Sequence, residues 1–130
     1  LSFLDDNAFG READKSFWVR GESRAEFIIK MDRPVRKAIF TVAAGAVPTD
    51  VTVAVGWHRQ SLHLEAGETE QVTFAMPPGL PYEKEIHGGL LWTASVSSSG
   101  GFTPIFYDPA LTDVRYLGVR VKPMLEARPQ

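Results

Sequence analysis

The sequence contains no cysteine among its 130 residues. This absence excludes disulfide bonds, zinc sites built from cysteine and catalysis by a thiol. A dominant charge of one sign is also missing, because the formal net charge is −2 and acidic and basic residues are interspersed. Without a basic field, the chain lacks the attraction for polyanions that nucleic-acid-binding proteins use. We therefore expect no nucleic-acid partner, while the cellular compartment stays open.

Long apolar runs and helical patterns are absent as well. The longest uncharged stretch covers 86–107, and two Gly pairs, a Ser run and Pro104 interrupt it. A membrane helix needs about 20 consecutive apolar residues, so we expect no direct membrane insertion. No segment shows an apolar stripe with a period of 3.6 residues. A short helical turn over 108–112 is the most helix that the sequence predicts.

Alternation of apolar and polar residues, by contrast, recurs along the chain. Val51, Val53 and Val55 put every second side chain on one face, which is the pattern of a half-buried strand. Similar runs cover 16–20, 24–31, 35–43, 62–64, 72–76, 89–97 and 114–122. The apolar phase of these runs predicts a core of Phe27, Ile29, Phe40, Val42, Val53, Val55, Leu62, Leu64, Phe74, Trp92, Val119 and Val121.

Turn signals separate these runs and define the fold class. Segments 56–60 and 65–68 have the length of hairpin connections, and three prolines over 77–81 should exclude both helix and ladder. We predict one all-β domain over 1–130, a two-sheet antiparallel sandwich of jelly-roll or immunoglobulin-like topology, with a frayed tail at 124–130. The start at Leu1 suggests a domain from a longer protein.

Catalytic and metal motifs are weak. A Ser-His-Asp triad can be assembled on paper from His58, His63 or His87, but no G-x-S-x-G motif is present. No H-x-x-x-H spacing supports zinc, and the carboxylate pairs Glu68/Glu70 and Glu83/Glu85 look solvated rather than placed for glycoside cleavage. We therefore expect a non-enzymatic domain without a cofactor, and a small hydrolase is disfavoured.

One segment is a weak calcium candidate. Asp5, Asp6 and Asn7 gather oxygen ligands of the kind that Ca²⁺ prefers. The D-x-D-x-D-G spacing is absent, however, and Asx-rich turns are common without metal. A turn without metal is the preferred interpretation.

Aromatic residues beside cations form the candidate ligand site. Trp57, His58 and Arg59 follow one another in a predicted turn, and Trp18 shares a predicted outward face with Arg20. Indole faces stack on sugar rings while polar side chains bond their hydroxyls, so this set predicts a carbohydrate surface. The alternative is that Trp18 and Trp92 cover the two ends of the core.

A Gly-rich and aromatic loop follows the strand at 89–97. Its residues Phe102, Pro104, Phe106 and Tyr107 are too apolar for a fully exposed loop. We predict that they fold back over the open end of the sandwich, with Asp113 and Arg115 in an ion pair at the base.

Three stretches together suggest a family. They are Leu4-Asp5-Asp6-Asn7-Ala8-Phe9 with Phe17-Trp18-Val19-Arg20-Gly21, then 64–69 with 72–74, and 101–104 leading to 113–119. Their order resembles the soluble C-terminal β-sandwich domain of bacterial polytopic membrane proteins similar to lipid-linked-sugar glycosyltransferases. More loosely, the pattern is similar to jelly-roll carbohydrate-binding modules. The resemblance implies an extracytoplasmic accessory domain, with the chemistry in the membrane portion.

Two functions follow as hypotheses. The first is a non-catalytic accessory domain of a larger membrane or secreted protein that binds glycan or contacts the membrane portion of its parent. The second is a structural or protein–protein interaction module of immunoglobulin-like type. An exposed aromatic platform beside polar groups favours the first, and an exposed apolar patch or unpaired edge favours the second.

Overall fold

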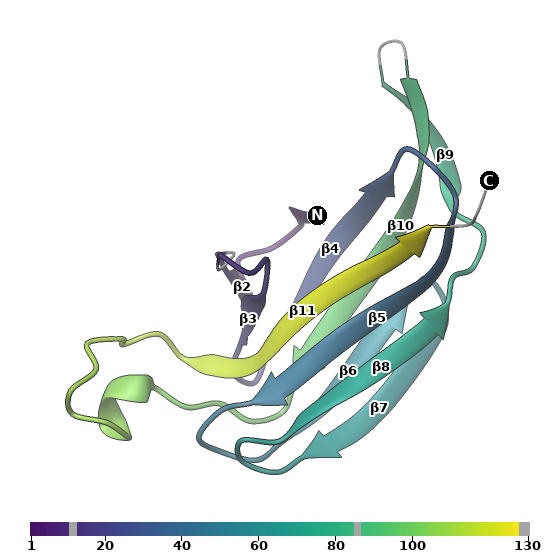
Figure 1. The fold of residues 1–130 in the computed structure, drawn as a ribbon. Coiled ribbons are helices and arrows are strands. Elements are labelled where there is room, and N and C mark those ends of the chain that lie inside the picture. Colours follow the sequence, from purple (N-terminus) through teal and green to yellow (C-terminus); the bar gives the residue numbers. More distant parts are fainter. Residues whose placement is uncertain (11–12, 85–86, 128–130) are drawn as a thin grey trace.

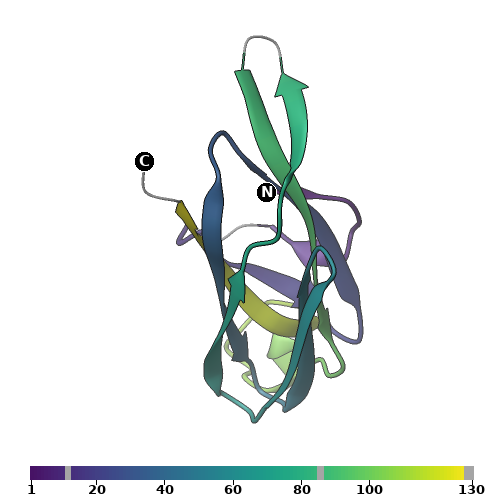
Figure 2. The same cartoon turned by 90° about the vertical axis from the view of Figure 1, so that its right-hand side faces the viewer.

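Two antiparallel sheets face each other in a β-sandwich (Figure 1; Figure 2). The computed structural model describes residues 1–10, 13–84 and 87–127. Sheet A has the order β1-β4-β10-β6-β7 with β9 also paired to β10, and sheet B has the order β2-β3-β11-β5-β8. The strands are β1 (Ser2–Phe3), β2 (Ala8–Phe9), β3 (Phe17–Arg20), β4 (Arg24–Met31), β5 (Val35–Ala44), β6 (Thr49–Val55), β7 (His58–Leu64), β8 (Thr69–Ala75), β9 (Leu80–Lys84), β10 (His87–Ser98) and β11 (Leu117–Ala127).

Four nested strand pairs define the topology. β6 pairs with β7 through a two-residue turn, and outside this pair lie β5 with β8, β4 with β10, and β3 with β11. Successive pairs alternate between sheet A and sheet B. The chain is thus one long hairpin rolled into two layers, which is the eight-stranded jelly roll. Of the two topologies expected from the sequence, the pairings match this one.

The core between the sheets confirms the predicted strand faces. Eleven of the twelve predicted core residues are buried, and Phe27, Phe40 and Val53 are fully so. The exception is Leu62, which is half-buried because β7 forms the edge of sheet A. The alternating pattern therefore predicted the inward phase of each of these strands correctly.

Two connections differ from the sequence prediction. The predicted turn over 56–60 contains only Gly56 and Trp57, because β7 already begins at His58. The segment 65–68 does not close a hairpin, since β7 belongs to sheet A whereas β8 pairs with β5 in sheet B. Alternation within a strand carries no information about which sheet the strand joins.

The ends of the last strands also differ. The predicted fraying from residue 124 is wrong for 124–127, where Met124 and Leu125 pair with Ile39 and Ala38 of the long strand β5; residues 128–130 lie outside the described part. β9 forms despite Pro81, because it is an edge strand that β10 alone flanks. The helical turn is a 3₁₀ turn at Pro104–Phe106 rather than at 108–112.

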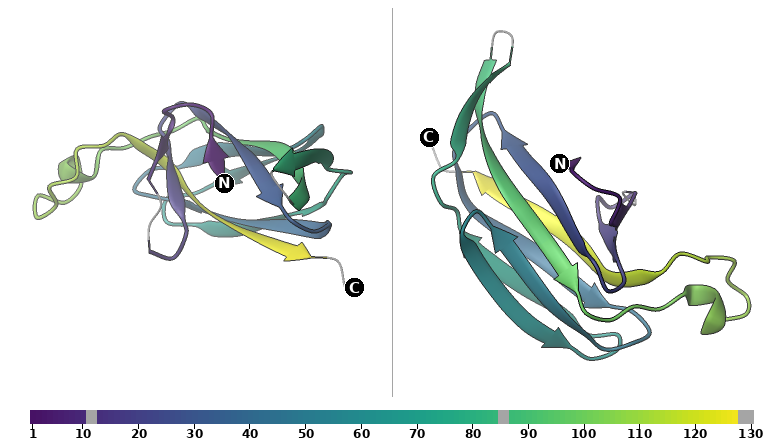
Figure 3. Two further views of the ribbon diagram at one scale, coloured as in Figure 1. Left: turned by 90° about the horizontal axis from the view of Figure 1, so that it is seen from above. Right: turned by 180° about the vertical axis from the view of Figure 1, so that it is seen from behind.

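Two features project from opposite ends of the sandwich. The β9–β10 hairpin extends beyond one end, and residues 99–116, here called the arm, extend beyond the other (Figure 1; Figure 3). Within the described residues, no helix has the length and apolarity needed to cross a membrane.

Candidate functional site

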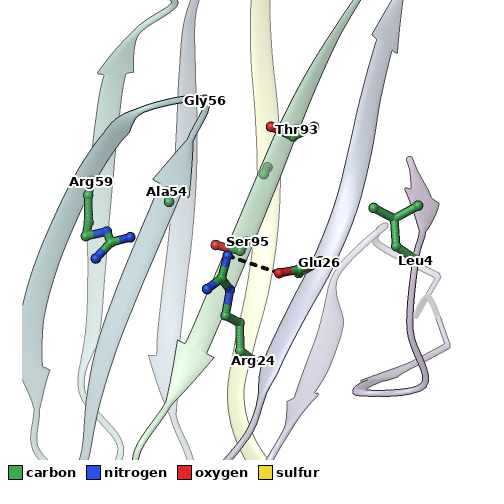
Figure 4. Close-up of a pocket in the computed structure, with 9 residues that line it drawn as sticks. Leu4, Arg24, Glu26, Ala54, Gly56, Arg59, Thr93 and Ser95 are labelled. Carbon is green, nitrogen blue, oxygen red and sulfur yellow. Dashed lines mark ion pairs between the residues drawn. The ribbon is translucent and has the colours of Figure 1, made fainter.

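A shallow groove crosses the outer face of sheet A (Figure 4). Its floor is made of small side chains, because the outward positions of the central strands β6 and β10 hold Ala54, Thr93 and Ser95. The groove has a volume of about 260 Å³. Its walls are longer side chains from the flanking segments, namely Leu4, Arg24 and Glu26 on one side and Arg59 on the other.

Two guanidinium groups line this groove from opposite walls (Figure 4). Arg24 Nη2 lies 3.0 Å from Glu26 Oε1, so a carboxylate balances this cation. Arg59 forms no ion pair with any residue that the structure describes. The groove therefore carries one uncompensated positive charge beside the hydroxyl groups of Thr93 and Ser95.

Trp57 is the chain neighbour of Gly56, which lines this groove, and it is 75% exposed. It follows Gly56 in the β6–β7 turn, where a φ of 58° at Gly56 provides the left-handed conformation that tight hairpins need. A second groove of about 360 Å³ adjoins the indole, and Gly56 and Thr93 line both grooves. The remaining lining is apolar and consists of Pro77, Pro78, Leu80, Leu91 and Trp92.

The structure brings together only part of the predicted ligand set. Trp57 and Arg59 line the adjoining grooves, and the ring of His58 lies 5.6 Å from that of Trp57. Trp18 and Arg20, however, lie on β3 in sheet B. The single surface predicted for all five residues is therefore wrong, because β3 and β7 belong to different sheets.

The alternative interpretation of the other two tryptophans has structural support. Trp18 is half-buried and packs edge-on against Phe102, with ring centroids 5.9 Å apart. Trp92 is 4% exposed, and its Nε1 donates a hydrogen bond of 2.8 Å to the carbonyl oxygen of Pro77. Both indoles thus cover parts of the sandwich, while Trp57 alone among the three is largely exposed.

The arm agrees with the prediction at its base and departs from it at its tip. Phe102 and Pro104 are buried, and Arg115 and Asp113 form the expected ion pair at 2.7 Å. Phe106 is 83% exposed and Tyr107 58% exposed, so the tip does not cover the sandwich as predicted. The Phe102 ring packs against Trp18 and lies over Gly45, and the Tyr107 ring meets it edge-on with a centroid distance of 5.9 Å.

The calcium candidates are Asp5, Asp6 and Asn7, and two of their side chains form hydrogen bonds to the backbone. Asp5 accepts hydrogen bonds from the backbone amides of Asn7 and Glu26, both at 3.0 Å. Asn7 donates its side-chain amide to the carbonyl oxygen of Arg24 at 3.0 Å, while Asp6 is exposed. These contacts fasten the N-terminal segment to β4. No group of three or more metal-ligating side chains occurs in the ranges that the structure describes.

The contacts of His63 do not form a hydrolytic arrangement. His63 Nδ1 lies 2.7 Å from Asp50 Oδ1, but its Nε2 lies 3.0 Å from Glu65 Oε1. A carboxylate thus occupies the place that a nucleophilic hydroxyl would need. The side chains of His87 and Glu83, and all of Glu85, lie outside the described residues.

The pKa of His63 is raised above its usual value, first by the hydrogen bond to Asp50 and then by that to Glu65. The imidazolium is favoured in the folded state, so this contribution to stability is fully present below the unfolded pKa and is lost as pH rises through the folded pKa. We expect Asp50→Asn to lower the pKa of His63, measured by NMR titration of the ring resonances. An unchanged pKa would contradict the assigned cause.

No sequence pattern indicated Thr93, Ser95 or Leu80 as site residues. The nearness of Thr93 and Ser95 to Arg59 depends on the pairing of β10 with β6, where Ser95 lies opposite Ala54. Comparison of the chain with protein-family models, with curated proteins and with solved structures gave no match.

Proposed function

We propose that this is a non-catalytic accessory domain that binds carbohydrate on the outer face of sheet A. One observation carries the proposal: the exposed indole of Trp57 adjoins a groove lined by Arg59 and by the hydroxyl of Thr93. A sugar ring would stack on the indole face while its hydroxyls take hydrogen bonds from the guanidinium. The jelly-roll fold, which occurs among lectins, is an analogy that adds support.

The affinity expected of this site is low. One stacked aromatic ring contributes on the order of 1–2 kcal/mol, and the groove is shallow and open. A single module should therefore bind with a dissociation constant in the high-micromolar to millimolar range. Such weak binding suits an accessory domain that keeps a larger protein near its substrate.

The charge pattern of the groove supports binding rather than catalysis. Glycoside hydrolysis needs two carboxyl groups on either side of the scissile bond. Among the described groove-lining residues only Glu26 carries a carboxyl group, and it pairs with Arg24. By the resemblance described above, the parent would be a membrane or secreted protein, and the domain extracytoplasmic.

Glycan-array screening followed by calorimetry of any hit tests this proposal. Trp57→Ala should weaken binding by about 5- to 30-fold, since about 1–2 kcal/mol of stacking is lost and about 1.4 kcal/mol corresponds to a factor of ten. Arg59→Gln should also weaken it. Arg20→Gln is the matched control, because this arginine lies on sheet B. Equal loss in both arginine variants, or no loss for Trp57→Ala, would contradict the proposed surface.

A second candidate function is protein–protein interaction, and the arm favours it. Five large apolar or aromatic side chains of the arm are exposed, from 37% for Tyr116 to 83% for Phe106. Exposed apolar side chains gathered in one place mark interaction surfaces. This observation is independent of the carbohydrate site.

A further inference from the structure

Internal hydrogen bonds hold the arm although it exposes its apolar side chains. The amide of Ile105 donates to the carbonyl oxygen of Asp113 across the arm at 3.1 Å, and the 3₁₀ turn holds Phe106 at the tip. Long loops of this kind in compact domains are usually functional. Because the backbone is already fixed, docking of the tip would cost little conformational entropy.

The base of the arm is clamped to the sandwich. A Cβ added at Gly21 would lie 2.6 Å from the ring of Tyr116 and 2.8 Å from the Cα of Gly101, so the two glycines permit a close approach. Tyr116 Oη donates a hydrogen bond of 3.0 Å to Glu22 Oε2. Phe102 and Leu117 exchange two backbone hydrogen bonds of 2.8 Å. The arm therefore projects in a fixed direction.

The same chain has an apolar groove toward its opposite end. The arm follows Ser98 at one end of β10, and Ser98 pairs with Val51 at the beginning of β6. The groove beside Trp57 and Leu80 follows the other end of β6. Its volume is about 360 Å³, whereas a cavity of roughly 150 Å³ holds a benzene ring. The groove is thus large enough to accept a phenyl ring such as that of Phe106.

The charges beside the two surfaces are complementary. On the arm, Asp113 pairs with Arg115, whereas Asp108 forms no ion pair within the described residues. Beside the groove, Arg59 is likewise without an ion-pair partner in the described part of the chain. A carboxylate two residues from the apolar anchor Phe106 therefore matches a guanidinium near the apolar groove.

We propose that the arm of one copy docks into the groove of a second copy, with Phe106 against Trp57 and Leu80. Asp108 then lies opposite Arg59. Because two different surfaces meet, the contact is heterologous and continues into a ring or a filament. A docked arm and a stacked sugar ring would use the same indole, so they exclude each other. The proposed self-association does not depend on carbohydrate binding.

Sedimentation velocity of the purified chain without glycan tests this proposal. We expect the average mass to rise with protein concentration, and Phe106→Ser and Leu80→Ser each to remain monomeric. A mixture of these two variants should form a one-to-one dimer, because one retains its groove and the other its arm. Met124→Ser is the matched control, since Met124 is 56% exposed on sheet B, and it should associate like the unaltered chain.

A charge exchange supplies a second readout. Asp108→Arg and Arg59→Asp should each weaken association, and the chain that carries both changes should recover it. A monomer at every concentration, association that persists in Phe106→Ser, or a mixture that stays monomeric would each overturn the proposal. Circular dichroism confirms that the variants are folded, as expected for exposed positions.

Discussion

Replacing Phe40 with Ala should lower the free energy of unfolding by about 3–5 kcal/mol. Phe40 is fully buried at the centre of β5, and its ring packs edge-on against Phe74 with a centroid distance of 5.9 Å. Truncation removes the buried ring and leaves a cavity between the two sheets, which close packing prevents from collapsing completely. Urea denaturation followed by far-UV circular dichroism measures the change.

Gln71→Ala is the control for this prediction. Gln71 is exposed on β8 and pairs with Thr41, the neighbour of Phe40 in β5. A surface substitution of this kind should change stability by less than about 0.5 kcal/mol. A loss below about 1 kcal/mol for Phe40→Ala would mean that this face of β5 is not in the core.

Trp92→Ala should cost about 3–5 kcal/mol as well. The indole is 4% exposed, and it forms part of the wall of the apolar groove beside Trp57. Its hydrogen bond to the carbonyl oxygen of Pro77 fixes the segment that leads into β9. The variant should therefore lose both stability and the shape of the groove, which thermal unfolding and the sedimentation assay report separately.

Two further variants test the hydrogen bond of Trp92 and the exposed position of Trp57. Trp92→Phe keeps an aromatic ring but leaves the Pro77 carbonyl unpaired, at an expected cost of about 1–3 kcal/mol. Trp57→Ala should change stability by less than about 0.5 kcal/mol, because its indole is 75% exposed. Equal destabilisation by Trp57→Ala and Trp92→Ala would contradict the assignment of one indole to the core and the other to the surface.

The fold class could be predicted because side-chain alternation is a local property. Val51, Val53 and Val55 show their inward phase in the sequence, and the structure buries all three. Strand pairing is not local: β3 pairs with β11 almost one hundred residues later. Nothing in the alternation distinguishes jelly-roll from immunoglobulin-like order, so the sequence left both open.

The candidate site shows the same limit. Trp57 and Arg59 are two residues apart in the chain, and they line adjoining grooves in the structure. Trp18 and Arg20 do not belong to this surface, because β3 and β7 lie in different sheets. Alternation along the chain does not reveal which sheet a strand joins. Thr93 and Ser95 lie near Arg59 because of the register in which β10 pairs with β6, which the sequence does not show. Composition also suggested that Phe106 would be covered, but an apolar side chain can be covered by another molecule instead of by its own chain.

The three tryptophans allow one direct measurement of the carbohydrate proposal. Each indole N–H gives its own NMR resonance, and the structure places Trp57 and Trp92 in the lining of the apolar groove, with Trp57 exposed and Trp92 buried, and Trp18 on sheet B. During titration with a glycan to millimolar concentration, the Trp57 resonance should shift most and the Trp18 resonance should stay in place. If no glycan shifts the Trp57 resonance, or if Trp18 responds instead, carbohydrate binding on the outer face of sheet A is contradicted.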